Sequence, residues 1–272
     1  MDWKPILKEA VDIARHTGGM LQKGLRSGLT IAHKGPVDLV TNYDAAAQSA
    51  IIEGLSSRFP DHDFMAEENV SRRNNSEFCW IIDPIDGTTN FAHGFPIYSI
   101  SIALEYRKKI VLGVVSDPCR KEDFTAELGG GAFLNGKPIH VSLVRDLNDS
   151  LLATGFPYDL RENAENNLNH FNRFVKKAQG IRRCGSAALD LCYVACGRFD
   201  GFWELKLSPW DVAAASLILQ EAGGNISDFD GNPFSISMRE TLGSNGAIHR
   251  QMIKILRAGK GEKDVVSKER EE

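Results

Sequence analysis

Two aspartates, Asp83 and Asp86, stand three residues apart, directly after an apolar run at 80–82. Two carboxylates this close together repel each other unless a positive charge lies between them. Divalent cations such as Mg²⁺ prefer carboxylate, carbonyl and water oxygens, and they usually keep positions open for a substrate phosphate. The pair therefore predicts a magnesium site, with the backbone carbonyl of Ile85 as a further ligand.

The residues that follow Asp86 suggest a place for an anion beside the metal. Gly87 permits a tight turn, and Thr88 and Thr89 are typical of the start of a helix. The first backbone N–H groups of a helix attract phosphate. Asp-Pro and Asp-Gly pairs are also common in ordinary loops, so this stretch alone fits a functional site and a pair of plain turns equally well.

Further acidic residues stand at comparable places in the chain. Glu67 and Glu68 follow a short apolar run at 64–66, and Asp211 opens an apolar helical run at 212–219. The carboxyl ends of strands are where α/β proteins assemble their sites. The simpler interpretations are two solvated glutamates and a helix-capping aspartate. The functional interpretation is that these carboxylates complete a metal site.

Apolar periodicity and turn residues predict the elements that must position these groups. We expect helices at 5–22, 45–58, 162–179, 187–196, 211–222 and 248–256, and strands at 64–66, 80–82, 98–104, 110–115, 151–154, 180–183, 201–204, 226–229 and 242–245. The strand at 80–82 should end at Asp83-Pro84, because proline lacks a backbone N–H. Asp44 should cap the second helix, and Asp211 should cap or open the fifth.

The length of 272 residues suits one large α/β domain or two lobes. A polar run at 145–150 predicts an N-terminal α+β lobe at 1–145 and a C-terminal α/β lobe at 146–259, followed by a disordered charged tail at 260–272. The net charge of −4 argues against a general nucleic-acid binder, and no apolar run reaches membrane-spanning length. An odd cysteine count of five and the lack of a signal-peptide pattern predict a cytoplasmic protein with reduced thiols.

Three blocks of the sequence resemble the inositol monophosphatase family of magnesium-dependent, lithium-sensitive sugar-phosphate phosphatases. The blocks are Ala66-Glu67-Glu68, the segment 80–91 around Asp83-Pro84-Ile85-Asp86-Gly87-Thr88, and the segment 210–224 that begins Trp210-Asp211-Val212. They occur in the order and at the spacings of that family, and the similarity runs from about residue 5 to residue 257. The resemblance implies a layered α-β-α-β-α fold, a homodimer, and two or three Mg²⁺ ions per site.

The resemblance also implies roles for individual residues. It places metal ligands at Glu67, Asp83, the Ile85 carbonyl, Asp86 and Asp211, and residues that orient and deprotonate the attacking water at Glu67 and Thr88. It places substrate contacts at Ile85, Asp86, Gly87, Thr88, Arg182, Gly185, Ser186, Ala187, Glu204 and Asp211. Of the adjacent Arg182 and Arg183, one is expected to face the phosphate or the sugar. Lys34 would belong to a mobile loop that recruits a further metal ion, and Asp44 would support the metal site from behind.

The sequence departs from the family pattern at two places. Ser186 stands where many relatives carry threonine, and the segment Lys206-Leu207-Ser208 before Pro209 is distinct. Both places lie among the expected substrate contacts, so they leave the sugar specificity open.

The sequence therefore predicts Mg²⁺-dependent hydrolysis of the phosphate monoester of a small polyol or sugar, with inositol 1-phosphate first in line and a metal-activated water as nucleophile. Fructose 1,6-bisphosphate is an alternative substrate, and adenosine 3′,5′-bisphosphate and NADP are further ones. A regulatory protein that binds RNA or the transcription machinery is an alternative of another class. Clustered carboxylates argue against it, because a binding module has no need to hold like charges together.

Overall fold

The computed structural model describes residues 2–27, 30–33, 39–68, 71–72 and 75–259. Within these ranges the helices are α1 (Lys4–Ser27), α2 (Asn42–Ser56), α3 (Thr88–Ala92), α4 (Leu168–Phe174), α5 (Ala187–Ala195), α6 (Pro209–Glu221) and α7 (His249–Gly259), with one short 3₁₀ helix (Leu147–Asp149). The strands of the N-terminal part are β1 (Ile31–His33), β2 (Leu39–Thr41), β3 (Asp63–Ala66), β4 (Ser71–Arg72), β5 (Phe78–Asp86), β6 (Ser99–Tyr106), β7 (Lys109–Asp117), β8 (Glu122–Glu127), β9 (Gly131–Leu134) and β10 (Lys137–Pro138). The later strands are β11 (Leu151–Thr154), β12 (Gly180–Arg182), β13 (Gly201–Leu205), β14 (Asn225–Ser227) and β15 (Glu240–Ser244).

In the described part of the chain, the strands form two large sheets and a small one. The first large sheet has the order β10-β9-β8-β7-β6-β5-β3-β4, and β3 and β5 run parallel in it while the other neighbours are antiparallel. The second has the order β12-β11-β13-β15-β14, with β11 parallel to β12 and β13. Strands β1 and β2 pair separately.

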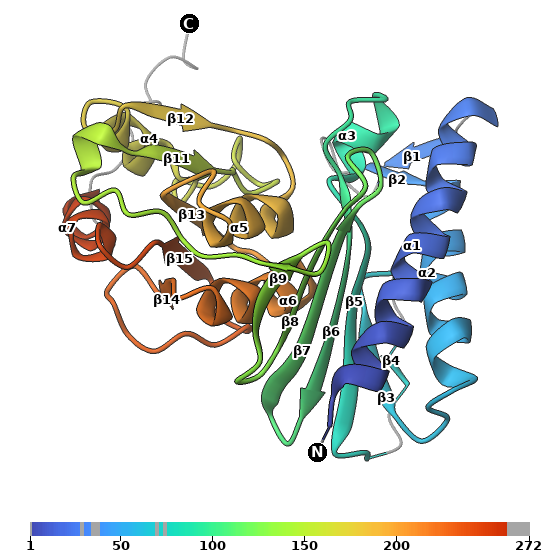
Figure 1. Cartoon of the computed structure of the whole chain (residues 1–272). Coiled ribbons are helices and arrows are strands. Elements are labelled where there is room, and N and C mark those ends of the chain that lie inside the picture. Colours follow the sequence, from blue (N-terminus) through green and yellow to red (C-terminus); the bar gives the residue numbers. More distant parts are fainter. Residues whose placement is uncertain (1, 28–29, 34–38, 69–70, 73–74, 260–272) are drawn as a thin grey trace, which may run out of the picture.

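Helices and sheets alternate in five layers (Figure 1). Helices α1 and α2 cover the outer face of the first sheet, α5 and α6 lie between the two sheets, and α4 and α7 cover the outer face of the second. The predicted α-β-α-β-α order of layers is confirmed.

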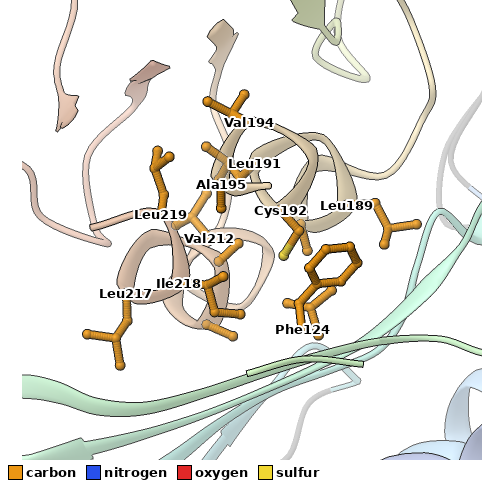
Figure 2. Packing of buried hydrophobic residues seen from close by; sticks show 14 of the residues in the cluster. Phe124, Leu189, Leu191, Cys192, Val194, Ala195, Val212, Leu217, Ile218 and Leu219 are labelled. Atoms are coloured by element: carbon orange, nitrogen blue, oxygen red, sulfur yellow. The ribbon is translucent and has the colours of Figure 1, made fainter. Parts of the chain in front are cut away.

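Strand β5 is buried on both faces, which explains its continuous apolar run. Trp80 and Ile82 pack into the cluster under α1 and α2, whereas Ile81 packs toward α5 and α6 on the opposite face. Figure 2 shows part of the cluster to which Ile81 belongs, where Phe124 of β8 lies beside Cys192 of α5 and Ile218 of α6. Strand β5 is therefore held from two layers at once, and the residues at its end are fixed in place.

The predicted end of the strand at Asp83-Pro84 was wrong. Strand β5 continues to Asp86, and its register against β6 shifts between Asp83 and Asp86. This bulge takes Pro84 out of the regular ladder, so its missing N–H leaves no sheet hydrogen bond unmade.

The two predicted capping aspartates also sit differently. Thr41 and Ser208 occupy the N-cap positions of α2 and α6, and Asp44 and Asp211 follow three residues later. Each aspartate accepts a hydrogen bond from the backbone N–H of its cap residue, at 2.7 Å in both helices. Both helices therefore begin with a capping box, which leaves the second carboxylate oxygen of each aspartate for another partner.

Two helix lengths differ from expectation. Helix α1 passes through Gly18 and Gly19 and ends at Ser27. Gly18 lies against Pro118, whose ring would stand 2.9 Å from a β-carbon, so this glycine serves close packing and does not end the helix. Helix α4 covers only part of the predicted 162–179. Asn167 precedes it in the left-handed conformation (φ 76°), and its buried side chain bonds to Thr154, Gly155 and Trp203 outside the helix.

The structure also bears on the predictions for the cysteines, for membrane-spanning segments and for the lobe boundary. All five cysteines are free thiols. In the part of the chain that is described, no helix combines the length and apolarity needed to cross a membrane. Lys34 and the tail 260–272 lie outside the described residues. The lobe boundary at 145–150, where the 3₁₀ helix lies, stays a prediction.

Candidate active site

The carboxylates that the sequence singles out line one cavity of about 490 Å³. Glu67 directly follows β3, Asp83 and Asp86 lie at the carboxyl end of β5, and Asp211 lies in the first turn of α6. Because β3 and β5 run parallel, their carboxyl ends meet at the same edge of the sheet. Residues from three separate segments are thus brought to one place.

The bulge in β5 shapes the centre of this cavity. The N–H of Ile85 donates to Oδ1 of Asp83 at 2.9 Å, and the carbonyl of Ile85 accepts from the Thr88 hydroxyl at 3.0 Å. Asp83 and Ile85 are both buried. Bulged residues leave the ladder, so the Ile85 carbonyl keeps a lone pair for a ligand that enters the cavity.

Asp86 is held by the N-terminus of α5. Its Oδ2 accepts from the Ser186 hydroxyl at 2.5 Å and from the Ala188 N–H at 2.8 Å, while its Oδ1 accepts from the Ala187 N–H at 3.3 Å. A carboxylate at this end of a helix is favoured by the helix dipole and by the unpaired amides. This contact connects the end of β5 to the middle helical layer.

A hydrogen-bonded chain runs from the cavity to the start of α2. The Thr88 hydroxyl donates to Asp44 Oδ1 at 3.1 Å, sharing its proton with the Ile85 carbonyl. Asp44 Oδ2 accepts from the Thr41 N–H at 2.7 Å and from the Thr41 hydroxyl at 2.6 Å. Because the proton of Thr88 is directed toward Asp44 and the Ile85 carbonyl, the lone pairs of its oxygen are available to accept a hydrogen bond from a molecule in the cavity.

Gly87 joins β5 to α3 at a place where no side chain fits. Its backbone is left-handed (φ 100°), and a β-carbon there would stand 2.9 Å from the carbonyl oxygen of Gly185 and 3.1 Å from that of Ile97. The first amides of the following short helix have no carbonyl of an earlier turn to bind. Glycine therefore allows β5, α3 and the segment before α5 to meet at the cavity.

Burial and mutual repulsion raise the pKa values of the cavity carboxylates. Burial raises the pKa of Asp83 well above its usual range, and the charges of Glu67, Asp86 and Asp211 raise it further. Burial, followed by the charge of Asp86, does the same to the pKa of Asp211. For Asp86, burial raises the pKa while the hydrogen bonds from Ser186 and the α5 amides oppose the rise.

This donor set fits a hard divalent cation. Among the ion pairs of the described residues, none involves Asp83, Asp86 or Asp211. Buried carboxylates without a basic partner are costly unless a cation or protons neutralise them. Carboxylate and carbonyl oxygens are the ligands that Mg²⁺ takes.

Another cluster of acidic residues lies outside the cavity, and its close spacing does not make it a metal site. Within the described ranges, the three carboxyl groups whose oxygens all lie within 4.8 Å of one another belong to Asp228, Asp230 and Glu240. Their carboxylate oxygens already accept hydrogen bonds from backbone N–H groups: that of Asn232 donates to Asp228 at 2.7 Å, and that of Phe229 donates to Glu240 at 3.1 Å. Among the described residues, no three of the cavity carboxylates approach one another that closely.

The side of the cavity away from β5 carries a second set of polar residues. Glu204 of β13 is seated against Gly155, where any β-carbon would overlap its carboxylate. Burial raises the pKa of Glu204 to about 8, and Arg183 opposes the rise. Burial also raises the pKa of Asp190, which lies in the first turn of α5.

The structure brings most of the predicted substrate contacts to this cavity, with one exception. Gly87, Thr88, Gly185, Ser186, Ala187 and Glu204 line it. Arg183 also lines it, whereas Arg182 is exposed on β12 and turns its guanidinium to the Ile181 carbonyl. The prediction for Arg182 therefore does not match its position, because successive strand residues point to opposite sides.

Sequence reasoning missed Asp190 and Asp159, which also line the cavity. Asp190 had a usable signal, since it is the acidic residue of an otherwise apolar helix and stands four residues after Ser186. Asp159 had none, because it lies in an irregular segment rich in polar residues.

Comparison with known proteins points to one family. A sequence model described as "Inositol monophosphatase family" matches residues 2–260. Inositol-1-monophosphatase of Synechocystis is 46% identical over 222 residues, covering 81% of this chain and 77% of that protein. Nus factor SuhB of Pseudomonas aeruginosa is 43% identical over 236 residues, covering 84% and 87%. The solved structure of inositol monophosphatase from Anabaena superposes with a TM-score of 0.86 at 38% identity, covering 95% of this chain and 97% of that one.

Proposed function

Since the chain belongs to the inositol monophosphatase family and is a phosphatase, we propose that it hydrolyses the phosphate monoester of a small polyol or sugar in a Mg²⁺-dependent reaction. Inositol 1-phosphate is the first candidate substrate. One observation carries the proposal: Glu67, Asp83, Asp86 and Asp211 line a single cavity together with the Ile85 carbonyl.

The residues that would hold Mg²⁺ fall into two overlapping groups. Glu67, Asp83 and the Ile85 carbonyl would hold one ion, and Asp83, Asp86 and Asp211 would hold another. When bound, Mg²⁺ acidifies its water and neutralises charge on the phosphate and the leaving oxygen. A third ion, for which the resemblance suggested the loop around Lys34, stays a prediction.

The protein groups near Thr88 would orient the attacking water. The Thr88 hydroxyl donates its own proton toward Asp44 and the Ile85 carbonyl, so it accepts a hydrogen bond from the water. Glu67, on the same cavity wall, would take the proton that the water loses as its oxygen bonds to phosphorus. The bond from phosphorus to the alcohol oxygen breaks in the same step, and the leaving oxygen takes a proton from solvent water. Backbone N–H groups of Gly87 and Thr88 would hold the phosphate oxygens, because transfer of a phosphoryl group depends mostly on positioning and charge stabilisation.

The alcohol of the substrate would face Glu204 and the start of α5. A glutamate with a pKa of about 8 is protonated at neutral pH. It then donates one hydrogen bond and accepts others, as a sugar hydroxyl requires. Arg183, Ser186 and Ala187 line the same side, which supports their role as substrate contacts.

Two further properties of the proposal rest on the family resemblance. We expect a homodimer, to be checked by light scattering, and inhibition of phosphate release by lithium. The cytoplasmic location stays a prediction.

A regulatory role is the second candidate function. Relatives from Pseudomonas aeruginosa and from Escherichia coli, 43% and 39% identical, carry the name Nus factor SuhB. We propose as a test a pull-down from a cell extract with wild type and Asp83→Asn. A regulatory surface independent of the metal would bind the same partners in both.

Phosphate release from a panel of sugar phosphates, with Mg²⁺ varied and lithium added, tests the first proposal. We expect release that requires Mg²⁺ and that falls by orders of magnitude in Asp83→Asn and Asp211→Asn, with both variants folded. Wild-type turnover in these variants would refute the assignment of the metal ligands.

A further inference from the structure

One basic residue of the cavity wall is already neutralised by the protein itself. The ammonium of Lys206 lies 2.6 Å from Oδ2 of Asp159. Lys206 comes from the connection between β13 and α6, and Asp159 comes from the segment between β11 and α4. Both residues line the cavity, so the ion pair joins two segments of its wall.

Lys206 is held firmly at this place. Its side chain is only 13% exposed, against 40% for Asp159. Its backbone is left-handed (φ 62°), a conformation that residues with a β-carbon rarely adopt, and its N–H donates to the Arg239 carbonyl at 2.6 Å. A strained backbone beside a cavity indicates that the position of the side chain matters.

The ion pair between Lys206 and Asp159 takes up one of the two basic side chains among the described residues that line the cavity. Among the described residues that line it, Arg183 and Lys206 are the basic ones, and Arg183 faces the charges of Glu204 and Asp190. The hydrogen bond from Lys206 lowers the pKa of Asp159, so this carboxylate is charged at neutral pH. Its other oxygen, Oδ1, is buried and has no hydrogen-bond partner among the described residues.

We propose that Asp159 is a specificity-determining residue that excludes substrates with a second phosphate by occupying the ammonium of Lys206. A lysine without a carboxylate partner is a good ligand for a phosphate, whereas a carboxylate at the same place repels one. The pair thus favours monophosphates of uncharged polyols. Inositol 1-phosphate should therefore be a better substrate than fructose 1,6-bisphosphate, whose second phosphate Asp159 would repel. This inference rests on the proposed phosphatase function.

The experiment compares kcat/KM for inositol 1-phosphate and fructose 1,6-bisphosphate in full-length wild type, Asp159→Asn and Asp159→Asn/Lys206→Met. Asparagine keeps the size of Asp159 and can still bond to Asn163. We expect the single variant to raise the ratio of bisphosphate to monophosphate kcat/KM about tenfold, as one charge-assisted hydrogen bond would. The double variant should lose that gain.

Glu165→Gln is the matched control. It also removes one negative charge, but Glu165 pairs with Arg239 at 3.6 Å on the surface and does not line the cavity. The ratio should stay at the wild-type value in this variant. Thermal unfolding confirms that each variant is folded, and Asp159→Ser serves as a second variant if Asp159→Asn is not.

The outcomes separate this inference from the proposed function. If wild type releases no phosphate from any sugar phosphate with Mg²⁺, the proposed function itself fails. If wild type is active and the ratio is unchanged in Asp159→Asn, the role of Asp159 is refuted while the phosphatase stands. An equal rise in Glu165→Gln, or a wild type that already prefers the bisphosphate, would also overturn it.

Discussion

The Thr88 hydroxyl donates a hydrogen bond to Oδ1 of Asp44 at 3.1 Å, although 44 residues separate the two in sequence. Asp44 is itself fixed at the start of α2 by two hydrogen bonds from Thr41. A small helix cap thus determines the orientation of a hydroxyl in the cavity.

Removal of this hydroxyl should slow the reaction more than it weakens substrate binding. We expect Thr88→Ala to lower kcat about 100-fold, which is typical for loss of a group that positions a proton in transit. Thr88→Ser keeps the hydroxyl and should stay within about tenfold of wild type. Steady-state kinetics with inositol 1-phosphate provides the measurement, and a change confined to KM would contradict the role.

Ser186 should contribute to stability as well as to the site. Its hydroxyl donates to Asp86 at 2.5 Å and accepts from the Leu189 N–H at 3.3 Å, as an N-cap does. Ser186→Ala should lower the free energy of unfolding by about 1–3 kcal/mol, because a buried carboxylate loses its donor and α5 its cap. Ser186→Thr keeps both bonds and should be close to wild type in urea unfolding. Equal stability of the alanine variant would show that the bond to Asp86 is unimportant.

Gly87 should be less replaceable than another glycine of similar backbone. Gly87→Ala introduces a β-carbon 2.9 Å from a backbone oxygen at φ 100°, whereas Gly94→Ala meets nothing within 4 Å at φ 66°. The first substitution should cost about 2–3 kcal/mol and the second about 1 kcal/mol. Thermal unfolding of the two variants side by side gives the comparison, and equal losses would contradict the close packing inferred for Gly87.

Magnesium should stabilise the protein more at pH 8 than at pH 6. The pKa values of Asp83 and Asp211 are raised well above their usual range, mainly by burial, so in the absence of metal these groups bind protons more tightly in the folded than in the unfolded chain. Their contribution to stability is complete at low pH and is lost as pH rises from about 4 toward the folded pKa values. Mg²⁺ replaces the missing protons, and it binds best to deprotonated carboxylates.

The measurement is the melting temperature with EDTA and with Mg²⁺ at both pH values. In wild type, the rise in melting temperature caused by Mg²⁺ should be larger at pH 8 than at pH 6. In Asp83→Asn, this rise should be smaller than in wild type at both pH values. A shift that is the same at pH 6 and pH 8 would mean that the cavity carboxylates do not bind the ion.

The order of layers was predicted from the family resemblance, whereas strong apolar runs predicted most of the individual helices and strands. Trp80, Ile81 and Ile82 show a strand buried on both faces, and α5 and α6 carry nearly continuous apolar residues. Pro84 misled the prediction of the strand end, since only pairing with β6 reveals that a bulge accommodates a proline. The length of α4 depends on the long-range bonds of Asn167, which no local pattern contains.

The candidate site was predictable where acidic residues follow elements with clear signals. Asp83 and Asp86 close strand β5 and Asp211 opens helix α6, and both elements have clear apolar signals. The choice between Arg182 and Arg183 depends on which face of an edge strand meets the cavity, and the sequence does not carry that information. The pair of Lys206 and Asp159 depends on two irregular segments, which is why sequence analysis noted only the unusual residues 206–208.

The decisive experiment on the metal site is calorimetric titration of the metal-free protein with Mg²⁺ in the presence of inorganic phosphate. Wild type should bind two or more ions per chain. Asp83→Asn and Asp211→Asn, folded as judged by circular dichroism, should lose at least one of these ions. Binding of the same number of ions at the same affinity in all three proteins, or no binding at all in wild type, would contradict the proposed metal site.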